Sequence, residues 1–435
     1  MVAIAIRREN KSRWERRTPL TPAHVRQIVA QGIDVVVQPS PVRIFTDAEY
    51  QHAGAQVHEA IDACPIVFGV KEMPADSFQP DRTYVFFSHT HKAQPYNMPM
   101  LRRVIDQGAT LIDYELITDH KGQRLIFFGR YAGLAGMLDT LWALGRRLEA
   151  EGLRSPFAAV RRAWEYSDLN EARQAIYQVG ATISKDGLPE EITPLVCGFA
   201  GYGRVSLGAQ EIYDLLPVRS IDPEDLAAFR AGGEASPHFL YKSVFREEHM
   251  YRRRDGGAFD FGEFVASPER YEARFEELLP HIDVLLHGIY WEERYPELMS
   301  RDFLRRCWSA PTRPRLRVIG DVTCDIRGSL ACTIRPADTD HPVYVYRPED
   351  DTAVEAFDGP GPLVLAVDNL PCELPRDASE EFGSALLPFI ARLARAHENG
   401  AAALEDLPDE IRRAVIVHRG RLTEAHAHLA EHLPG

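Results

Sequence analysis

The sequence has no run of about eighteen apolar residues, and its basic side chains are fewer than its acidic ones, 50 against 64. The first absence excludes a membrane-spanning helix. The formal net charge of −14 disfavours binding to nucleic acid or to an anionic membrane surface. The start of the chain becomes charged too early for a signal peptide. These observations predict a cytoplasmic protein.

Cysteine is scarce and scattered. The six cysteines form no close CxxC pair and mostly have apolar neighbours. We therefore expect reduced, buried thiols, with neither disulfides nor a metal site. There is also no internal repeat. What is present, 435 residues with 45% hydrophobic content, is enough for two cores, so we expect two domains.

Short β-branched runs alternate with helix-length polar segments in the first third of the chain, which is typical of a parallel sheet. The predicted strands are residues 2–7, 34–38, 66–71, 83–88 and 110–114, with a further candidate at 124–128. Helices are predicted over residues 23–31 and 131–151. Farther along, strands are predicted at 193–198, 284–288, 315–319, 342–346 and 363–367, and helices at 209–216, 379–397, 409–417 and 422–432.

The predicted fold class is α/β, with two Rossmann-like, doubly wound parallel-sheet domains and a cleft between them. Residues 1–136 form the first, substrate-binding domain. Residues 137–362 form a dinucleotide-binding domain with a helical insertion at 153–190. Residues 363–435 return to the first domain, on which the C-terminal helices are expected to pack.

A glycine-rich turn follows the predicted strand at 193–198 and opens a helix. In Gly201-Tyr202-Gly203-Arg204-Val205-Ser206, the two glycines permit a tight turn that brings backbone N–H groups to a pyrophosphate at the helix N-terminus. Ser206 replaces the third glycine. The pattern predicts a dinucleotide cofactor, and the alternative is an ordinary strand-to-helix turn.

Three acidic segments after the glycine turn are candidates for the cofactor site. Asp222 lies twenty-one residues after Gly201, where an acid usually accepts hydrogen bonds from the ribose 2′-hydroxyl and favours NAD over NADP. Asp222 equally suits the start of a helix, with Pro223 at its first position, and both interpretations stay open. The other two segments are expected to line the nicotinamide site: Asp321 with Asp325, and Asp368-Asn369-Leu370.

Charged residues gather at the predicted strand ends of the first domain, where open α/β sheets bind ligands. Arg17 stands just before a helix and suits a bidentate grip on a carboxylate. Lys71 ends a strand, where partial burial lowers the pKa of a lysine and makes it a base. His89 can exchange protons near neutral pH. For each of these residues alone, an ordinary structural role is the alternative.

Ordered motifs along nearly the whole chain make it resemble the lysine-forming saccharopine dehydrogenases, or lysine–2-oxoglutarate reductases, of the alanine dehydrogenase and transhydrogenase superfamily. The motifs include Glu15-Arg16-Arg17, Gly69-Val70-Lys71-Glu72, Phe86-Phe87-Ser88-His89, Leu111-Ile112-Asp113-Tyr114-Glu115, Phe128-Gly129-Arg130 and Gly320-Asp321-Val322-Thr323-Cys324-Asp325. The resemblance implies that the ε-amine of lysine condenses with the keto carbon of 2-oxoglutarate, and that NADPH or NADH reduces the imine to saccharopine, or the reverse.

The resemblance also implies roles for individual residues. Lys71 and His89 match the acid/base pair, and Asp325 matches an aspartate close to the nicotinamide, with Asp321 beside it. The substrate-binding residues would be Arg17, which grips a carboxylate, and Glu15, Glu72, Lys92, Glu115 and Arg130.

Two features depart from the pattern of the family. Arg327 stands where relatives have a glycine. Bifunctional reductases that the chain resembles tend to prefer NADPH, in conflict with Asp222, so the expected cofactor is NADP or NAD. Their glutamate-forming half is absent, so a separate glutamate-forming saccharopine dehydrogenase is expected, and a homo-oligomer stays open. The alternatives are an amino-acid or opine dehydrogenase with another amine and keto acid, and a catalytically silent dinucleotide-binding subunit.

Overall fold

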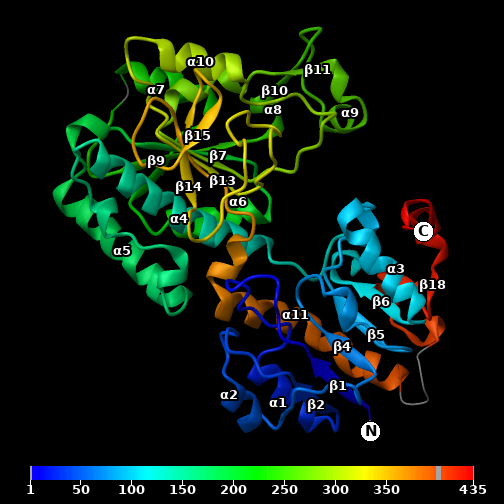
Figure 1. Ribbon diagram of the computed structural model, residues 1–435. Helices are drawn as coiled ribbons and strands as arrows, with labels where there is room; N and C mark the ends of the chain where they lie inside the picture. Colours follow the sequence, from blue (N-terminus) through cyan, green and yellow to red (C-terminus); the bar gives the residue numbers. More distant parts are fainter. Residues whose placement is uncertain (1, 233, 398–402, 435) are drawn as a thin grey trace. The chain divides into compact units, whose positions relative to one another are not determined.

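The computed structural model describes residues 2–232, 234–397 and 403–434. The chain divides into two compact units, one comprising Met1–Phe128 with Pro375–Gly435 and the other comprising Gly129–Leu374. Each unit is built around its own sheet with helices on its faces (Figure 1). The predicted α/β class with two separate sheets is confirmed.

The sheet of the first unit has the strand order β18-β17-β6-β5-β4-β1-β2-β3. The strands from β6 to β3 are parallel to their neighbours, whereas β17 and β18 are antiparallel. Because parallel strands share one carboxyl edge, the segments after β1, β4, β5 and β6 emerge side by side. The strands are β1 Ala3–Ile6, β2 Asp34–Val37, β3 Gln56–Val57, β4 Ile66–Phe68, β5 Thr83–Phe86, β6 Thr110–Asp113, β17 Val415–His418 and β18 Arg421–Leu422.

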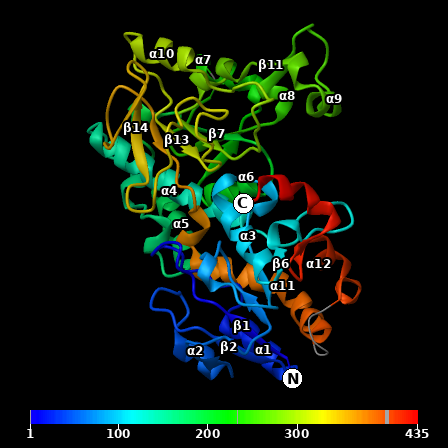
Figure 2. The ribbon, with the colours of Figure 1, turned by 45° about the vertical axis from the view of Figure 1, so that its right-hand side comes forward.

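A C-terminal helix completes the core of the first unit. Phe382, Leu386 and Ile390 of α11 are buried in the same apolar cluster as Ile4 of β1 and Phe86 of β5. In Figure 2 α11 and α12 lie with β6 and β1 in this unit. The helices are α1 Pro22–Ala30, α2 Asp47–His52, α3 Met98–Asp106, α11 Pro375–Ala396 and α12 Asp409–Arg413.

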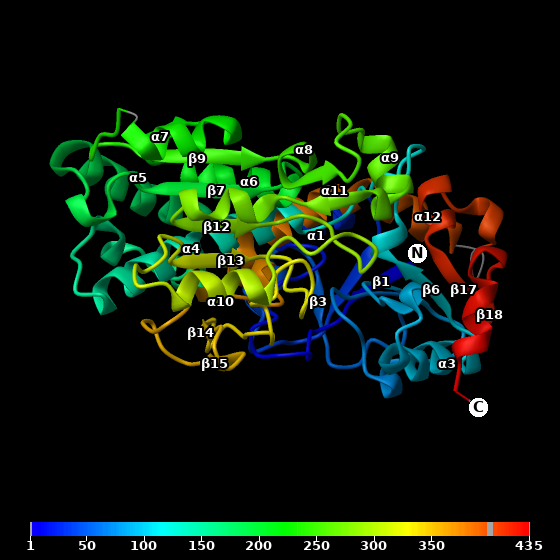
Figure 3. The same ribbon diagram turned by 90° about the horizontal axis from the view of Figure 1, so that it is seen from above.

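The sheet of the second unit has the order β15-β14-β16-β13-β12-β7-β9-β8, and much of this succession can be followed in Figure 3. The strands from β16 to β8 are parallel to their neighbours, and β14 and β15 are antiparallel. The strands are β7 Val196–Ala200, β8 Val218–Ser220, β9 Leu240–Phe245, β12 Val284–His287, β13 Val318–Asp321, β14 Val343–Arg347, β15 Thr352–Val354 and β16 Leu363–Leu365, with β10 Tyr251–Arg253 and β11 Tyr271–Ala273 forming a separate ribbon.

Small residues let two helices of this unit touch through their backbones. A Cβ atom on Gly133 of α4 would lie 1.8 Å from the carbonyl oxygen of Val205, and one on Gly208 of α6 would lie 2.2 Å from that of Arg130. Gly208 therefore provides the close packing usually assigned to the third glycine of the turn, whose place Ser206 takes. The helices are α4 Gly129–Ala150, α5 Leu169–Asp186, α6 Arg204–Tyr213, α7 Leu226–Gly232, α8 Glu247–Met250, α9 Phe261–Ala266 and α10 Arg301–Ser309.

Several boundaries differ from the predicted ones. The candidate strand at 124–128 is wrong, since Arg124 makes only an isolated bridge to Thr118. The helix predicted over 409–417 ends at Arg413, because the β-branched run Val415-Ile416-Val417 pairs with β6. The units meet at 128/129 and 374/375 rather than at 136/137 and 362/363, because all of α4 and β16 belong to the second unit. No helix in the described part of the chain is long and apolar enough to cross a membrane.

Candidate active site and dinucleotide turn

The carboxyl edge of the first sheet brings together most of the charged residues predicted for the substrate site. Lys71 and Glu72 follow β4, His89 follows β5, and Glu115 follows β6 in the short 3₁₀ helix Tyr114–Leu116. These three strands are neighbours and run parallel. The strand ends thus place an amine, an imidazole and two carboxylates along one edge.

The imidazole of His89 is oriented by Glu72. Nδ1 of His89 lies 2.9 Å from one carboxylate oxygen of Glu72, and Lys11 Nζ lies 2.8 Å from the other. Burial alone would raise the pKa of Glu72, but these two hydrogen bonds outweigh it and lower the pKa to about 2. The ionised Glu72 accepts a hydrogen bond from the Nδ1–H group of His89, so Nε2 is the ring atom left to exchange a proton with a substrate.

Asp113, at the end of β6, fixes the loops on either side of this imidazole. It is fully buried and accepts hydrogen bonds from the backbone N–H groups of Ser88 at 3.0 Å, His89 at 3.1 Å and Glu115 at 2.8 Å. Burial opposes ionisation, but the nearby imidazole of His91, with Nδ1 3.9 Å away, and the hydrogen bond from the Ser88 hydroxyl prevail and lower the pKa of Asp113. His89 is held at φ 53°, in the left-handed region.

Lys71 is held through its backbone by Glu9. The carboxylate of Glu9 accepts hydrogen bonds from Val70 N at 2.7 Å and from Lys71 N at 3.0 Å. Burial, together with the positive charge of Arg17, lowers the pKa of Lys71 below its ordinary value. A lowered pKa favours the neutral amine, the form of Lys71 that can accept a proton.

Glu9 gives a testable pH dependence. Burial, reinforced by the charge of Glu15, raises the pKa of Glu9 from 4.5 to about 7. Between these values the folded protein keeps a proton that the unfolded chain has lost, so the free energy of unfolding should fall as pH rises from about 4.5 to 7, by up to about 3 kcal/mol. In Glu9→Gln this decline should be absent in denaturant titrations across that range.

The exposed Glu59→Gln variant is the control for Glu9, because Glu59 is 61% exposed in its pair with Arg8. It should keep the decline of the wild-type protein. A Glu9→Gln variant whose stability still falls between pH 4.5 and 7 would contradict the assignment of this proton to Glu9.

Arg17 and Glu15 form a buried ion pair. Arg17 Nε and one terminal nitrogen lie 2.7 and 2.6 Å from the two carboxylate oxygens of Glu15, and both side chains are 1% exposed. The guanidinium also lies over the ring of Phe128, 4.2 Å from its centroid. Glu15 therefore takes one edge of the guanidinium, and a substrate carboxylate would have to bind along another edge.

Glu115 is surrounded by basic side chains. Its carboxylate pairs with Lys92 Nζ at 3.1 Å and with Arg124, and His91 Nε2 lies 3.5 Å away. The charges of Arg124 and Lys92 overcome the effect of burial and lower the pKa of Glu115. Of the predicted substrate residues, Arg130 alone lies in the second unit, where its guanidinium grips Glu211 of α6 at 2.7 Å through two nitrogens.

The glycine turn has the geometry that a pyrophosphate requires. Gly201 follows β7 with φ 98°, a conformation in which glycine is favoured, and Gly203 caps α6. A Cβ atom on Gly203 would meet nothing within 4 Å, so the backbone there is open to an approaching ligand. Ser206 is buried, and its hydroxyl accepts a hydrogen bond from Gln210 at 3.0 Å. The turn and the N-terminus of α6 fit a dinucleotide.

Asp321 is buried and held by contacts within the second unit. It is buried at the end of β13, where it contacts His287 Nδ1 at 2.9 Å and Thr333 Oγ1 at 2.6 Å. Asp325 lies beyond it in the loop, and burial with the charge of Asp321 raises the pKa of Asp325. Asp368, Asn369 and Leu370 follow β16, with Asp368 exposed. Asp325 and Asp368 are therefore more open to a cofactor than Asp321.

The structure places Asp222 away from the glycine turn. It is exposed and lies two residues beyond β8, the edge strand, and β9 lies between β8 and β7. Its side chain makes no capping hydrogen bond to the 3₁₀ turn that follows. The spacing from Gly201 suggested a position at the ribose, but the chain forms the edge strand β8 before β9 pairs with β7.

Comparisons with known proteins show the family to which this chain belongs. Models of the alanine dehydrogenase/PNT N-terminal and C-terminal domains match residues 5–135 and 260–425. An alpha-aminoadipic semialdehyde synthase of Arabidopsis thaliana is 37% identical over 98% of this chain and 41% of its own length. The mitochondrial protein of that name from Mus musculus is 34% identical over 98% and 47%. The chain belongs to the alanine dehydrogenase/PNT family.

Another relative of this chain is a saccharopine dehydrogenase [NAD(+), L-lysine-forming] of Yarrowia lipolytica. The two are 27% identical over 90% of this chain and 92% of the length of the relative. The predicted resemblance to the lysine-forming saccharopine dehydrogenases is thus confirmed. The chain spans less than half the length of the two synthases. The cofactor of the family is NAD or NADP, as predicted.

Solved structures of the alanine dehydrogenase/PNT family share the fold. An L-alanine dehydrogenase has a TM-score of 0.63 at 20% identity, covering 100% of both chains. A transhydrogenase from Sinorhizobium meliloti has a TM-score of 0.56 at 15% identity, covering 97% of this chain and 100% of its own. At these identities the likeness supports the fold alone, and it confirms the two Rossmann-like domains.

Glu9, Lys11 and Asp113 also belong to the site, but the sequence analysis did not predict them. Glu9 and Asp113 lie inside motifs that carry the resemblance, but their bonds to backbone N–H groups 61 and 25 residues away leave no local signal. Arg327, the departure from the family pattern, adopts φ 51°, the region that favours glycine, and pairs with Asp351 at 3.0 Å.

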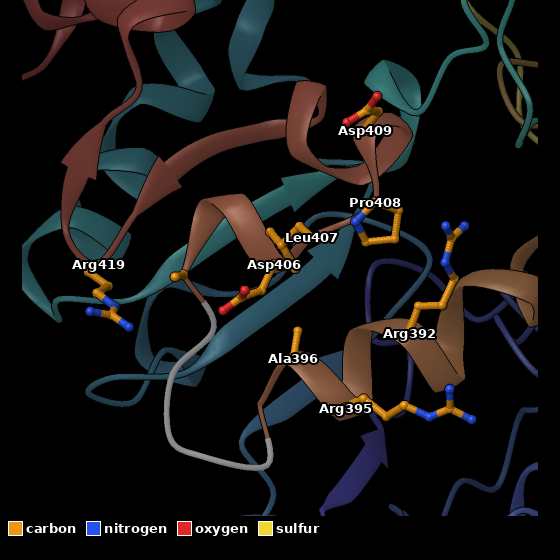
Figure 4. A pocket seen from close by; sticks show the side chains of 9 residues that line it. Arg392, Arg395, Ala396, Asp406, Leu407, Pro408, Asp409 and Arg419 are labelled. Atoms are coloured by element: carbon orange, nitrogen blue, oxygen red, sulfur yellow. The ribbon is translucent and has the colours of Figure 1, made fainter.

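Other candidate sites are sparse. A hollow of about 810 Å³ beside α11 and α12 is lined by Arg392, Arg395, Asp406, Asp409 and Arg419 (Figure 4), and it contains none of the predicted site residues. In the described ranges no group of three His, Cys, Asp or Glu side chains is placed to hold a metal ion. Cys64, Cys197, Cys332 and Cys372 are buried, and Cys307 and Cys324 are partly exposed.

Proposed function

We propose that this protein condenses L-lysine with 2-oxoglutarate and reduces the resulting imine to saccharopine with NADPH or NADH, or runs the reverse reaction. The observation that carries the proposal is the set of adjacent strand ends at which Lys71, Glu72 and His89 lie, with Glu72 orienting the imidazole. The relatives named as lysine-forming saccharopine dehydrogenase and alpha-aminoadipic semialdehyde synthase support the choice of substrates.

Each group of the first unit has a step that suits its chemistry. Neutral Lys71 takes a proton from the ε-ammonium of lysine, and the free amine attacks the keto carbon of 2-oxoglutarate. One proton moves from the attacking nitrogen to the oxygen on that carbon, and His89 donates a second from Nε2. The oxygen then leaves as water and yields the protonated imine. Arg17 binds a substrate carboxylate beside its pair with Glu15.

The second unit holds the dinucleotide. Gly201, Tyr202, Gly203, Arg204 and Val205 would line the pyrophosphate, because the backbone at Gly203 is open and α6 begins there. When bound, the nicotinamide supplies the hydride that reduces the imine carbon. Asp325 and Asp368 are the acids that we assign to the nicotinamide end.

The assay uses purified protein with lysine, 2-oxoglutarate and each reduced nucleotide. The reduced-nucleotide absorbance should fall only when both substrates are present, and mass spectrometry should find saccharopine. No oxidation with either nucleotide would refute the proposal. Oxidation with another amine or keto acid from a panel would instead identify an amino-acid or opine dehydrogenase. A separate glutamate-forming saccharopine dehydrogenase, a homo-oligomer and a cytoplasmic location stay predictions.

A further inference from the structure

The strand beside the glycine turn is β9. It pairs in parallel with β7 along its length, from Val196 opposite Tyr241 to Ala200 opposite Phe245. The N–H group of Gly201 donates to the carbonyl oxygen of Phe245 at 3.0 Å. In dinucleotide-binding sheets, the residue that reads the adenosine ribose lies at the carboxyl end of the strand next to the one leading into the turn. Here that position follows Phe245 and is Arg246.

Arg246 is placed against the turn itself. Its guanidinium carbon lies 4.7 Å from the ring centroid of Tyr202, the residue between the two glycines. A cation over an aromatic face is held there by the ring quadrupole. Arg246 is exposed, and among residues 2–232, 234–397 and 403–434 no carboxylate forms an ion pair with its guanidinium. The positive charge therefore faces solvent at the ribose end of the turn.

We propose that Arg246 binds the 2′-phosphate of NADPH and makes NADPH the preferred nucleotide of this protein. A planar guanidinium fork matches the geometry of a phosphate, whereas the ribose diol of NADH offers it no charge. Asp222, the acid that would have favoured NADH, lies beyond the edge strand β8. The proposal rests on dinucleotide binding by the second unit, and not on the amine or the keto acid.

The competing residue is Glu247. It follows Arg246 at the start of α8, and a carboxylate one residue farther along could accept hydrogen bonds from the two ribose hydroxyls of NADH. The two assignments predict opposite nucleotide preferences, so one comparison of the nucleotides separates them.

The experiment measures the dissociation constants of NADPH and NADH by calorimetry, and kcat/KM for each in the active protein. NADPH should bind the wild-type protein more tightly. Arg246→Ala should weaken NADPH binding roughly 10- to 100-fold, the loss of charge-assisted hydrogen bonds, and leave NADH binding nearly unchanged. Arg246→Lys should recover part of the loss, because it restores the charge without the fork.

Arg219→Ala is the matched control. Arg219 is an exposed arginine that stacks on an aromatic ring, Phe239, at 3.7 Å, but it lies on the edge strand β8. Arg219→Ala and Asp222→Ala should both leave the ratio of the NADPH and NADH dissociation constants unchanged.

Three results would overturn the proposal. The first is that the wild-type protein binds NADH more tightly than NADPH and that Glu247→Ala abolishes this preference. The second is that Arg246→Ala weakens the binding of NADPH and of NADH equally. The third is that Arg246→Ala leaves the ratio of the two dissociation constants unchanged. Calorimetry needs no turnover, so normal NADPH binding without oxidation in the presence of lysine and 2-oxoglutarate would refute the proposed substrates and leave the role of Arg246 intact.

Discussion

Lys71→Met should lower kcat for the oxidation of reduced nucleotide by roughly 10²- to 10⁴-fold, with nucleotide binding at the wild-type level. Methionine keeps the length and apolar stem of lysine but cannot accept a proton from the substrate ammonium. The wild-type kcat/KM should rise with pH as Lys71, whose pKa burial and Arg17 lower, loses its proton. That rise should disappear in Lys71→Met, and steady-state kinetics across the pH range measure both effects.

His89→Ala tests the second member of the pair and should cause a loss of similar size. Because the two groups act on one substrate, the double variant should lose less than the product of the single losses. Lys121→Met, at an exposed position in the same unit, is the control and should keep wild-type kinetics. A Lys71→Met variant with wild-type kcat and an unchanged pH profile would remove Lys71 from the mechanism.

Glu15→Ala should destabilise the first unit by about 3–5 kcal/mol, because it leaves the guanidinium of Arg17 buried without its carboxylate. Chemical denaturation followed by circular dichroism measures the loss, and amide hydrogen exchange should assign it to residues of the first unit. Glu15→Leu combined with Arg17→Met should recover much of the stability, since both charges are then gone.

An exposed pair in the same unit provides the control for Glu15. Arg8 and Glu59 are 40% and 61% exposed, so Glu59→Ala should cost at most about 1 kcal/mol. If Glu15→Ala were no more destabilising than Glu59→Ala, the buried pair would not be a support of the fold. If Arg17 binds substrate, Glu15→Ala would lower activity whether or not the pair stabilises the fold. The free energy of unfolding is therefore the deciding measurement.

Most of the parallel strands were predictable because they are buried on both faces and read as short apolar runs, as at Ile66-Val67-Phe68 and Val284-Leu285-Leu286. The strands that the sequence did not reveal have weaker signals. β9, Leu240–Phe245, interrupts its apolar residues with Lys242 and Ser243. β17 follows a short helix after a single residue, Ala414, and periodicity cannot resolve so abrupt a change.

Site residues could be located from the sequence where a reactive side chain directly follows a predicted strand. Lys71, His89 and Glu115 lie at the carboxyl edge as expected, because a parallel sheet puts all such ends together. Their catalytic and binding roles stay predictions. The position of Asp222 misled because distance along the chain does not give strand order. Only the pairing of β9 with β7 identifies Arg246 as the residue next to the turn.

Asp113 has a consequence for attempts to redesign substrate selectivity. Its carboxylate anchors the loop that carries His89 and the loop that carries Glu115, so an insertion or deletion after β6 will also displace the imidazole. Libraries aimed at a different amine should therefore keep both loop lengths and Asp113 fixed. They should vary side chains such as Lys92 and Arg124, which set the local charge around Glu115.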